Sequence, residues 1–280
     1  MFFGNEIKKK ENTLFLIDWN NLLWKSFHAH SNLSFAGHST ACLFGVVSQL
    51  TKHISAFKPA HIFVCNDFPP YKRRELFTNF KTNRSKLEPD MFNEFNKSKL
   101  DCANFLNVLN IPLIESPGLE ADDIIASLVR DYSGQFDRIV ILSNDDDLFQ
   151  LLTYPNVVIQ RSKVLYDINM FNAEYTPLDI KDYDKLTALR GTHNNIPGLP
   201  GIGPVKAKKI LTTGKWEEVY SQNKEILDLY LKLVKLPFND DFKSPPLVKH
   251  SYNERQVLNF LRVFGINLTQ NMIDSLQLLN

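Results

Sequence analysis

The stretch RIVILSNDDDLFQLL, residues 138–152, joins a run of β-forming residues to three consecutive aspartates and then to a second apolar run. An apolar run of this length that stops at Ser143 and Asn144 predicts a buried strand ending at the polar pair. The carboxylates of Asp145, Asp146 and Asp147 repel one another at such short spacing, and divalent cations would offset that repulsion. The stretch therefore predicts a strand whose end carries a cation site.

Similar runs recur along the first 170 residues and alternate with segments of helical periodicity. We expect strands at residues 13–18, 61–67, 110–116, 138–143 and 156–160, and helices at residues 42–57, 92–109 and 120–132. Alternation of this kind builds βαβ units around a mainly parallel sheet. The predicted fold class is therefore α/β, with a mainly parallel sheet flanked by helices.

The chain changes character near residue 180. Strand patterns stop there, Gly, Pro and Lys gather in NNIPGLPGIGPVKAKKIL, and helical periodicity resumes at residues 216–236 and 254–264. We therefore expect a loosely ordered polar arm at residues 1–12, an α/β domain at 13–180 and a helical domain at 181–280.

Composition restricts the class of protein. The 280 residues, 44% of them hydrophobic, suffice for a packed core, and a formal net charge of +1 excludes a polybasic or highly acidic protein. Three cysteines without CxxC spacing indicate a reducing compartment and argue against structural zinc. The N-terminal apolar segment is too short for a signal peptide, and no run reaches the roughly 18 apolar residues of a membrane helix. We therefore expect a cytoplasmic protein without membrane contact.

Carboxylates gather where the predicted strands end. Asp18 ends the first strand, Asp67 ends the second, and the aspartate triplet follows the fourth. Because parallel strands finish at one edge of their sheet, these side chains should meet in the crevice beyond that edge. In GLEADDIIASL, three more acids open the predicted helix at 120–132: Glu120, Asp122 and Asp123.

Each of these features has a plainer explanation when taken alone. Acids at a helix start offset the macrodipole, a single aspartate after a strand forms turns, and an acidic triplet is commonly a solvated loop. Together, four segments that deliver acids to one edge favour a metal site, because oxygen ligands without His or Cys suit Mg²⁺ or Mn²⁺. Clustered carboxylates suit a pair of such ions acting on a phosphate.

Basic residues form two patches that the near-zero net charge conceals. Residues 71–86, YKRRELFTNFKTNRSK, hold six Lys or Arg and one acid, which is typical of a nucleic-acid contact or of a basic surface helix. Residues 185–216 hold six Lys or Arg and no acid. Within them, Gly201 and Gly203 allow a phosphate to approach backbone amides ahead of a Lys-rich helix. A simple loop-to-helix turn is the alternative, but the apolar spacing favours a helix-hairpin-helix that grips a nucleic-acid backbone without reading sequence.

Six motifs resemble, in this order, those of the flap endonuclease (5′-nuclease) family, especially its bacteriophage members, also called phage RNase H or 5′-to-3′ exonucleases. They are LIDWNNLLWKSFHA, FVCND, FKTNR, GLEADDIIA, ILSNDDDLFQLL and NNIPGLPGIGPVKAKKIL, and they span residues 14–211. The resemblance implies a PIN-like α/β domain, a helical arch at about residues 70–100 that single-stranded DNA threads, and a helix-hairpin-helix (H3TH) region that holds the duplex.

The resemblance also implies roles for individual residues. A first metal site would use Asp18, Asp67, Glu120 and Asp122, with Asp123 nearby, and a second would use Asp145 and Asp147. Lys81 and Arg84 would be the catalytic cations of the arch, Lys81 being the one that contacts the scissile phosphate. The residues expected to contact nucleic acid are Arg73, Lys81, Arg84, Gly201, Gly203, Lys206, Lys208 and Lys209.

One segment departs from the family pattern. Before NIPG the family usually reads G-D-x-x-D-N, whereas this chain reads RGTHNN, with Gly191 and Asn194 in the acid positions. We therefore expect the second ion to bind more weakly, or to be helped by Asn194, His193 or water.

These observations predict a nuclease that uses Mg²⁺ or Mn²⁺, two ions with the second weakly held. The resemblance implies a monomeric structure-specific flap endonuclease and 5′-to-3′ exonuclease acting on nicked or branched DNA, 5′ flaps and RNA/DNA hybrids. It also makes K⁺ a candidate cation at the helix-hairpin-helix and replication proteins candidate partners. Two alternatives rank below it: a branched-DNA-binding protein with decayed catalysis, motivated by RGTHNN, and a phosphatase with an aspartate at a strand end, for which IDWNN lacks the usual second Asp.

Overall fold

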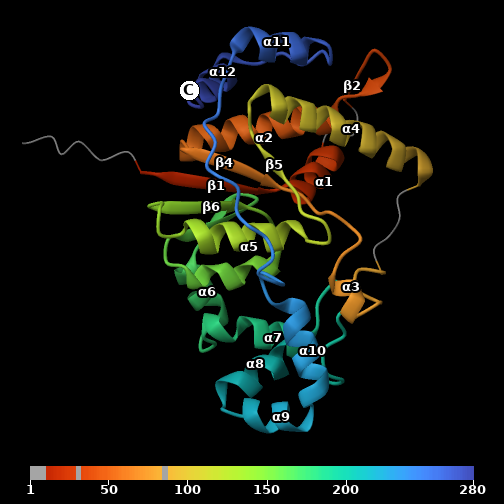
Figure 1. The fold of residues 1–280 in the computed structure, drawn as a ribbon, viewed down its shortest axis with the longest axis vertical. Helices are drawn as coiled ribbons and strands as arrows, with labels where there is room; N and C mark the ends of the chain where they lie inside the picture. The colour runs from red at the N-terminus through yellow and green to blue at the C-terminus, as the bar shows by residue number, and fades with distance from the viewer. Residues whose placement is uncertain (1–10, 30–32, 84–87) are drawn as a thin grey trace, which may run out of the picture.

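A six-stranded sheet in the order β5-β4-β1-β6-β7-β8 forms the centre of the computed structural model, which describes residues 11–29, 33–83 and 88–280 (Figure 1). Its strands are β1 (Thr13–Asp18), β4 (His61–Cys65), β5 (Leu113–Ile114), β6 (Arg138–Leu142), β7 (Val157–Arg161) and β8 (Val164–Tyr166). Neighbours pair in parallel except β7 and β8, which are antiparallel. The predicted α/β class with a mainly parallel sheet is confirmed.

Helices cover both faces of the sheet. On one face lie α1 (Trp19–Ala29), α2 (Ala41–Phe57), α4 (Pro89–Val108), α11 (Glu254–Arg262) and α12 (Gln270–Gln277), which share a core with Phe15 and Ile17 of β1. On the other face, α5 (Ala121–Tyr132), the 3₁₀ helix η1 (Asp146–Thr153), α6 (Ile168–Tyr175) and α7 (Tyr183–Arg190) pack with Leu14 and Leu16. Both faces of β1 are buried, which explains its unbroken apolar run.

Several elements differ from the sequence prediction. The patterns at 61–67 and 110–116 overestimated their strands, because β5 pairs with β4 only through Val64↔Leu113 and Cys65↔Ile114. The predicted helix at 216–236 is divided at Asn223 into α9 (Trp216–Gln222) and α10 (Lys224–Val234), and the Asn223 side chain donates to the Val219 carbonyl. The helices α1, α6, α7 and α12 and the hairpin β2 (Ser34–Phe35)–β3 (His38–Ser39) were not predicted.

The helices α7, α8 (Pro204–Thr212), α9 and α10 gather at one end of the molecule, with the short helices η2 (Ile180–Asp182) and α3 (Arg73–Leu76) nearby (Figure 1). A return segment, residues 235–253, then runs without regular secondary structure from α10 across α5 to α11. It is anchored at the sheet, because His61 Nδ1 bonds the Val248 carbonyl at 2.9 Å and the Ile62 N–H donates to His250 Nε2 at 2.7 Å.

Two expectations about organisation remain predictions. Residues 1–10 of the expected polar arm lie outside the described residues, and the domain boundary near residue 180 is untested. Among the helices that the structure describes, none is both long and apolar enough to cross a membrane.

Candidate metal centre

Carboxylates from four chain segments meet at the carboxyl edge of the sheet. The register Asp18↔Cys65 and Ile17↔Leu142 aligns the ends of β1, β4 and β6, so the residues that follow these strands share one edge. A cavity of about 680 Å³ opens there and is lined by Asp18, Asp67, Asp122 and Asp145. The sequence-predicted acids of the strand ends are therefore neighbours in space.

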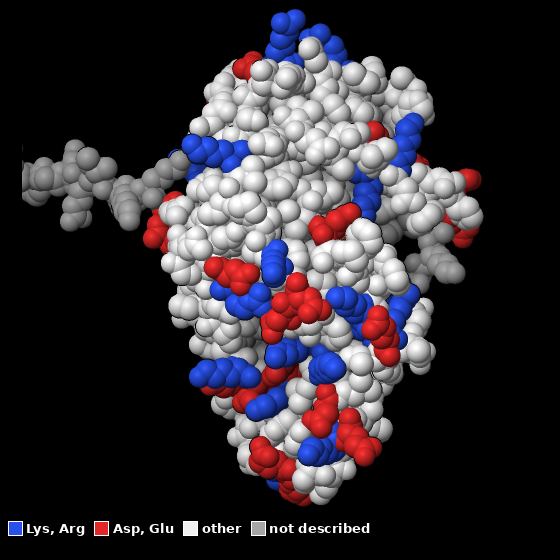
Figure 2. Space-filling view, viewed as in Figure 1, with Lys and Arg blue, Asp and Glu red and all other residues white. Residues whose placement is uncertain are grey.

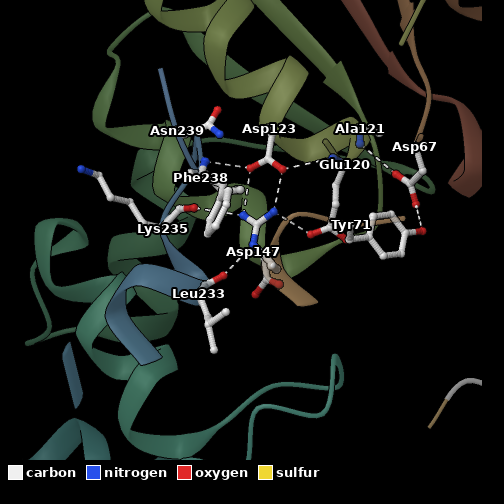
Figure 3. A network of polar contacts seen from close by, with 12 residues as sticks. Asp67, Tyr71, Glu120, Ala121, Asp123, Asp147, Leu233, Lys235, Phe238 and Asn239 are labelled. Carbon is white, nitrogen blue, oxygen red and sulfur yellow. Dashed lines mark hydrogen bonds and ion pairs between the residues drawn. The ribbon is translucent and has the colours of Figure 1, made fainter. Parts of the chain in front are cut away.

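Fixed donors orient the first two of these acids. Asp18 Oδ1 accepts the Asn21 N–H at 3.1 Å, and its Oδ2 accepts the Ser143 hydroxyl at 2.7 Å. Asp67 Oδ1 accepts the Ala121 N–H at 2.8 Å, and its Oδ2 accepts the Tyr71 hydroxyl at 3.0 Å (Figure 3). Both carboxylates are therefore held by hydrogen bonds from adjacent elements, at the carboxyl edge of the sheet.

Burial and mutual repulsion penalise the charged forms of these acids. Burial raises the pKa of Asp18 to about 7, with smaller contributions from Asp67 and Asp145. Burial, followed by the charges of Asp145 and Asp18, raises the pKa of Asp122 well above its ordinary value. Such a set of oxygen donors fits divalent cations, because bound cations would offset the charge that burial makes costly.

The acids at the start of α5 are held differently. Asp123 is 1% exposed, and its carboxylate forms a bidentate pair with Arg73 at 2.6 and 2.8 Å. It also accepts the Glu120 N–H at 3.1 Å within a capping box, and the Phe238 N–H at 2.8 Å (Figure 3). The expectation that Asp123 takes part in metal binding is therefore not supported by its geometry, since its oxygens are already engaged with protein donors.

Arg73 has a different role from the expected DNA contact. Its side chain is 3% exposed, and its donors reach Glu120, Asp123 and the carbonyls of Leu233 and Lys235. A guanidinium has five N–H donors, and these five contacts account for all of them. Breaking a buried pair of this kind costs about 3–5 kcal/mol. Arg73 is thus a structural cation at the base of residues 71–83.

Lys81 reaches the acids from that same segment. Its Nζ forms an ion pair with Glu120 Oε1 and lies 4.9 Å from the centre of the Tyr71 ring. Its backbone has φ +55°, and its N–H donates to the Asn194 carbonyl at 2.9 Å. Lys81 lines the cavity, so its charge lies beside the carboxylates. Arg84, the other expected arch cation, lies outside the described residues, as does part of the expected arch at 84–87.

A second group of ligands adjoins the first. One oxygen each of Asp145 and Asp147 and one nitrogen of His193 lie within 4.8 Å of one another, so these three residues could hold a metal ion. Asn194 Nδ2 is 3.4 Å from Asp147 Oδ2, and burial, followed by the charge of Asp145, raises the pKa of Asp147 to about 7. His193 and Asn194 therefore lie next to Asp145 and Asp147.

Gly191 cannot be replaced by an acid on this backbone. Its φ is +79°, and a Cβ placed on it would lie 2.5 Å from the Ile196 carbonyl oxygen. Asp146, the middle residue of the aspartate triplet, is also engaged elsewhere, because its carboxylate pairs with Arg161 at 2.5 Å. Neither position supplies a further carboxylate to Asp145 and Asp147.

The predicted phosphate-binding turn leads into α8. Gly201 has φ +73°, Gly203 is the N-cap of α8, and nothing lies within 4 Å of a Cβ on either residue. Lys206 and Lys209 are exposed on this helix, whereas Lys208 is half-buried. On the face shown in Figure 2, basic and acidic side chains crowd the lower part of the molecule, and the upper part is largely uncharged.

Sequence reasoning missed the wall that α1 contributes to the cavity. This wall consists of Asn20, Asn21, Trp24, Lys25 and His28, which line the same cavity as Asp122 and Lys81. The spacing of three and four residues in WNNLLWKSFHA would have indicated one helix face. Tyr71 and Ser143, which orient Asp67 and Asp18, had no comparable signal, because their roles depend on contacts between separate elements.

The chain is similar in sequence to known proteins. Residues 13–176 match the family model of the 5′-3′ exonuclease N-terminal resolvase-like domain. A 5′-3′ exonuclease of Aquifex aeolicus (strain VF5) is 31% identical over 246 residues, 80% of this chain and 81% of that protein. A DNA polymerase I of Deinococcus radiodurans is 32% identical over 216 residues, 75% of this chain and 22% of the polymerase.

Solved structures share the fold. The T5 D15 protein co-crystallised with metal ions superposes with a TM-score of 0.69 at 19% identity, covering 96% of this chain and 100% of that one. Flap endonuclease-1 from Methanococcus jannaschii superposes with a TM-score of 0.64 at 19% identity, covering 97% and 92%. The likeness extends over the helical end of the chain as well as the sheet.

Proposed function

The chain belongs to the 5′-3′ exonuclease family, and from that premise we propose that it is a divalent-metal-dependent, structure-specific 5′ nuclease. It acts as a flap endonuclease and 5′-to-3′ exonuclease that hydrolyses phosphodiesters in DNA replication or repair, including RNA primers paired with DNA. One observation carries the proposal. Four segments bring Asp18, Asp67, Asp122 and Asp145 into one cavity beside Lys81.

The proposed ligands follow from the donors that face the cavity. Asp18, Asp67 and Asp122 would hold a first Mg²⁺, and Asp145 and Asp147 would hold a second ion more weakly with His193. Glu120, the fourth ligand expected at the first site, does not line the cavity, and its two carboxylate oxygens pair with Arg73 and Lys81. Mn²⁺ is the alternative metal. When bound, such ions lower the pKa of a water molecule and stabilise the leaving oxygen of a phosphodiester. A related structure, the T5 D15 flap endonuclease, was solved with DNA and metal ions.

The chain's own cations act on the substrate phosphate. Lys81 places its ammonium beside the phosphoryl oxygens, where it offsets the negative charge that develops during cleavage. Arg84 remains a proposed second cation of this segment. Ser143 and Tyr71 hold the carboxylates of Asp18 and Asp67 so that they need not reorganise during the reaction.

The end of the molecule formed by α7, α8, α9 and α10 is proposed to hold the duplex. Gly201 and Gly203 leave room for the sugar-phosphate backbone, and the α8 lysines, Lys206, Lys208 and Lys209, neutralise it. K⁺ is a candidate ion at this turn. We further propose a monomer that works in the cytoplasm on nicked or branched DNA, with replication proteins as partners.

Cleavage of a labelled 5′-flap duplex in Mg²⁺, in Mn²⁺ and in chelator tests the proposal. We expect metal-dependent cutting near the junction that is lost in Asp145→Asn and kept in Asp274→Asn, a matched substitution of an exposed aspartate on α12. Failure of the wild type to cut with either metal, while it still binds the flap, would contradict the proposal.

That failure would favour a second function, a branched-DNA-binding protein with weakened catalysis. Gly191 and Asn194 motivate it, because they stand in positions where the family usually carries acids. The retained acids at the first site and Lys81 favour the nuclease, since buried negative charge near DNA weakens simple binding.

A further inference from the structure

The junction between α10 and the return segment, residues 233–238, forms hydrogen bonds with Arg73, Asp123 and Gln150, and we call it the tie. It connects α10 to the segment that crosses the sheet. Figure 3 shows Leu233, Lys235 and Phe238 of the tie surrounding the same polar network as Asp123 and Glu120. The tie is therefore in contact with Arg73 and with Asp123, at the start of α5.

The first clamp on the tie is Arg73. Its Nε donates to the Leu233 carbonyl at 2.8 Å and its Nη2 to the Lys235 carbonyl at 3.1 Å, while the same guanidinium holds Asp123. Asp123 accepts the Phe238 N–H at 2.8 Å, and the Phe238 ring lies 4.7 Å from the Arg73 guanidinium carbon. This clamp joins the tie to the start of α5.

A second clamp is Gln150 of η1. Its Nε2 donates to the Val234 carbonyl at 3.0 Å, and its Oε1 accepts the Leu236 N–H at 3.2 Å. The same amide nitrogen lies 3.1 Å from the Asp147 carbonyl oxygen. Gln150 therefore joins the tie to the element that carries Asp145 and Asp147, independently of Arg73.

On its other side the tie continues α10, which packs against α7, and α7 packs against α8. Tyr230, Leu233 and Val234 of α10 share a small buried core with Phe80 and Ile196. The tie thus joins the helices proposed to hold the duplex to the two acid-bearing elements, with one clamp at α5 and one at η1, in addition to the direct packing of α7 against η1.

We propose that Arg73 and Gln150 are positioning residues that fix the distance between the duplex-holding helices and the acidic cavity, and so determine which phosphodiester is cut. The inference rests on the proposed nuclease function. Neither side chain needs to touch the substrate. Because a displacement of about 1 Å at a reacting centre can lower a rate about 100-fold, a loosened tie changes both the rate and the position of cleavage.

The test maps cleavage products at single-nucleotide resolution on a labelled 5′-flap duplex under single-turnover conditions with Mg²⁺. Arg73→Lys keeps the charge but loses the five-donor geometry, and Gln150→Leu keeps the shape but loses both bonds to the tie. Arg130→Lys is the matched control, because Arg130 pairs with Asp131 and Asp240 at the surface, on the last turn of α5.

We expect both clamp variants to spread their cuts over neighbouring phosphodiesters and to cleave about 10- to 100-fold more slowly, with flap affinity within about threefold of the wild type. The control should match the wild type in all three measurements. If Arg73→Lys does not fold, as judged by thermal unfolding, Gln150→Leu alone decides the question.

Folded clamp variants that cut the same phosphodiester at the wild-type rate would overturn the inference. So would variants that lose rate but keep a single cut position, because that pattern indicates general damage to the site. Cleavage by the wild type is measured separately and tests the proposed function. Failure of the proposed function can therefore be distinguished from failure of the inference about the tie.

Discussion

Replacing Asp18 by Asn should stabilise the metal-free protein at alkaline pH, which is the opposite of the usual effect of a buried substitution. Asp18 is 7% exposed and its pKa is raised from 3.8 to about 7, first by burial and then, against two hydrogen bonds that lower it, by Asp67 and Asp145. The native state therefore holds a proton that the unfolded chain releases near pH 3.8. This contribution to stability is complete below pH 3.8 and is lost as pH rises through 7.

The size of the effect follows from the pKa difference. About three pH units at about 1.4 kcal/mol each give an upper limit of about 4 kcal/mol for the cost of ionising Asp18 in the native state. Asn is neutral at every pH, its Oδ1 can accept the Asn21 N–H, and its Nδ2 can donate to the Ser143 hydroxyl oxygen in place of the bond that Asp18 Oδ2 accepts. At about 2–4 °C per kcal/mol, half of this limit corresponds to a rise in Tm of about 4–8 °C.

Thermal unfolding in chelator between pH 5 and pH 8.5 measures the effect. We expect Asp18→Asn to melt above the wild type at pH 8 and the difference to shrink toward pH 5, whereas Asp274→Asn should follow the wild type throughout. Added Mg²⁺ should raise the Tm of the wild type more than that of Asp18→Asn, because bound metal relieves the same repulsion. If Asp18→Asn is no more stable than the wild type at pH 8 in chelator, the carboxylates do not destabilise the native state and the reasoning fails.

Three further changes have defined outcomes. Lys81→Met should lower the single-turnover rate of flap cleavage about 100- to 1,000-fold with little change in flap affinity, and an unchanged rate would remove Lys81 from the reaction. His193→Ala should weaken Mn²⁺ binding and abolish the ¹⁴N modulation of bound Mn²⁺ in pulsed electron paramagnetic resonance, because the imidazole faces Asp145 and Asp147; persistence of that signal would exclude His193 as a ligand. His250→Ala should cost about 1–3 kcal/mol in urea unfolding at pH 8, because the Ile62 N–H loses its acceptor. Burial lowers the pKa of His250, so its contribution to stability falls as pH drops below 6.5, and a variant that unfolds like the wild type at pH 8 would refute this account.

Much of the sheet and of its acidic edge could be predicted because strands buried on both faces are unbroken apolar runs in the sequence, and polar residues mark where they end. The run at residues 13–18 predicted β1 to the residue, and Asp18 at its end faces the cavity. The strand predicted at 110–116 was too long because its pairing depends on how far β4 extends, which local sequence does not record. The wall formed by α1 was missed because no helix was assigned to residues 19–29.

The sequence shows which residues are charged, but it does not show which residues they pair with. Arg73 and Lys81 belong to one basic segment, and both were expected to contact nucleic acid. In the fold, both are buried: Arg73 is enclosed by Asp123 and the tie, whereas Lys81 lines the cavity. Glu120, Asp122 and Asp123 likewise lie within three positions of one another, yet the helix turns Asp122 toward the cavity and Asp123 toward Arg73.

The sequence by itself determined the α/β class, the edge at which the acids gather, the family, and the glycine-rich turn before α8, because each depends on residue type and spacing along the chain. The tertiary structure alone decided which acids face the cavity, which arginine is buried, and how α10 is clamped behind the cavity by Arg73 and Gln150. The physical reason is that buried charges and backbone groups must find partners, and the partners of Arg73 lie 47 to 162 residues away in the chain, whereas those of Gln150 in the tie lie 84 and 86 residues away.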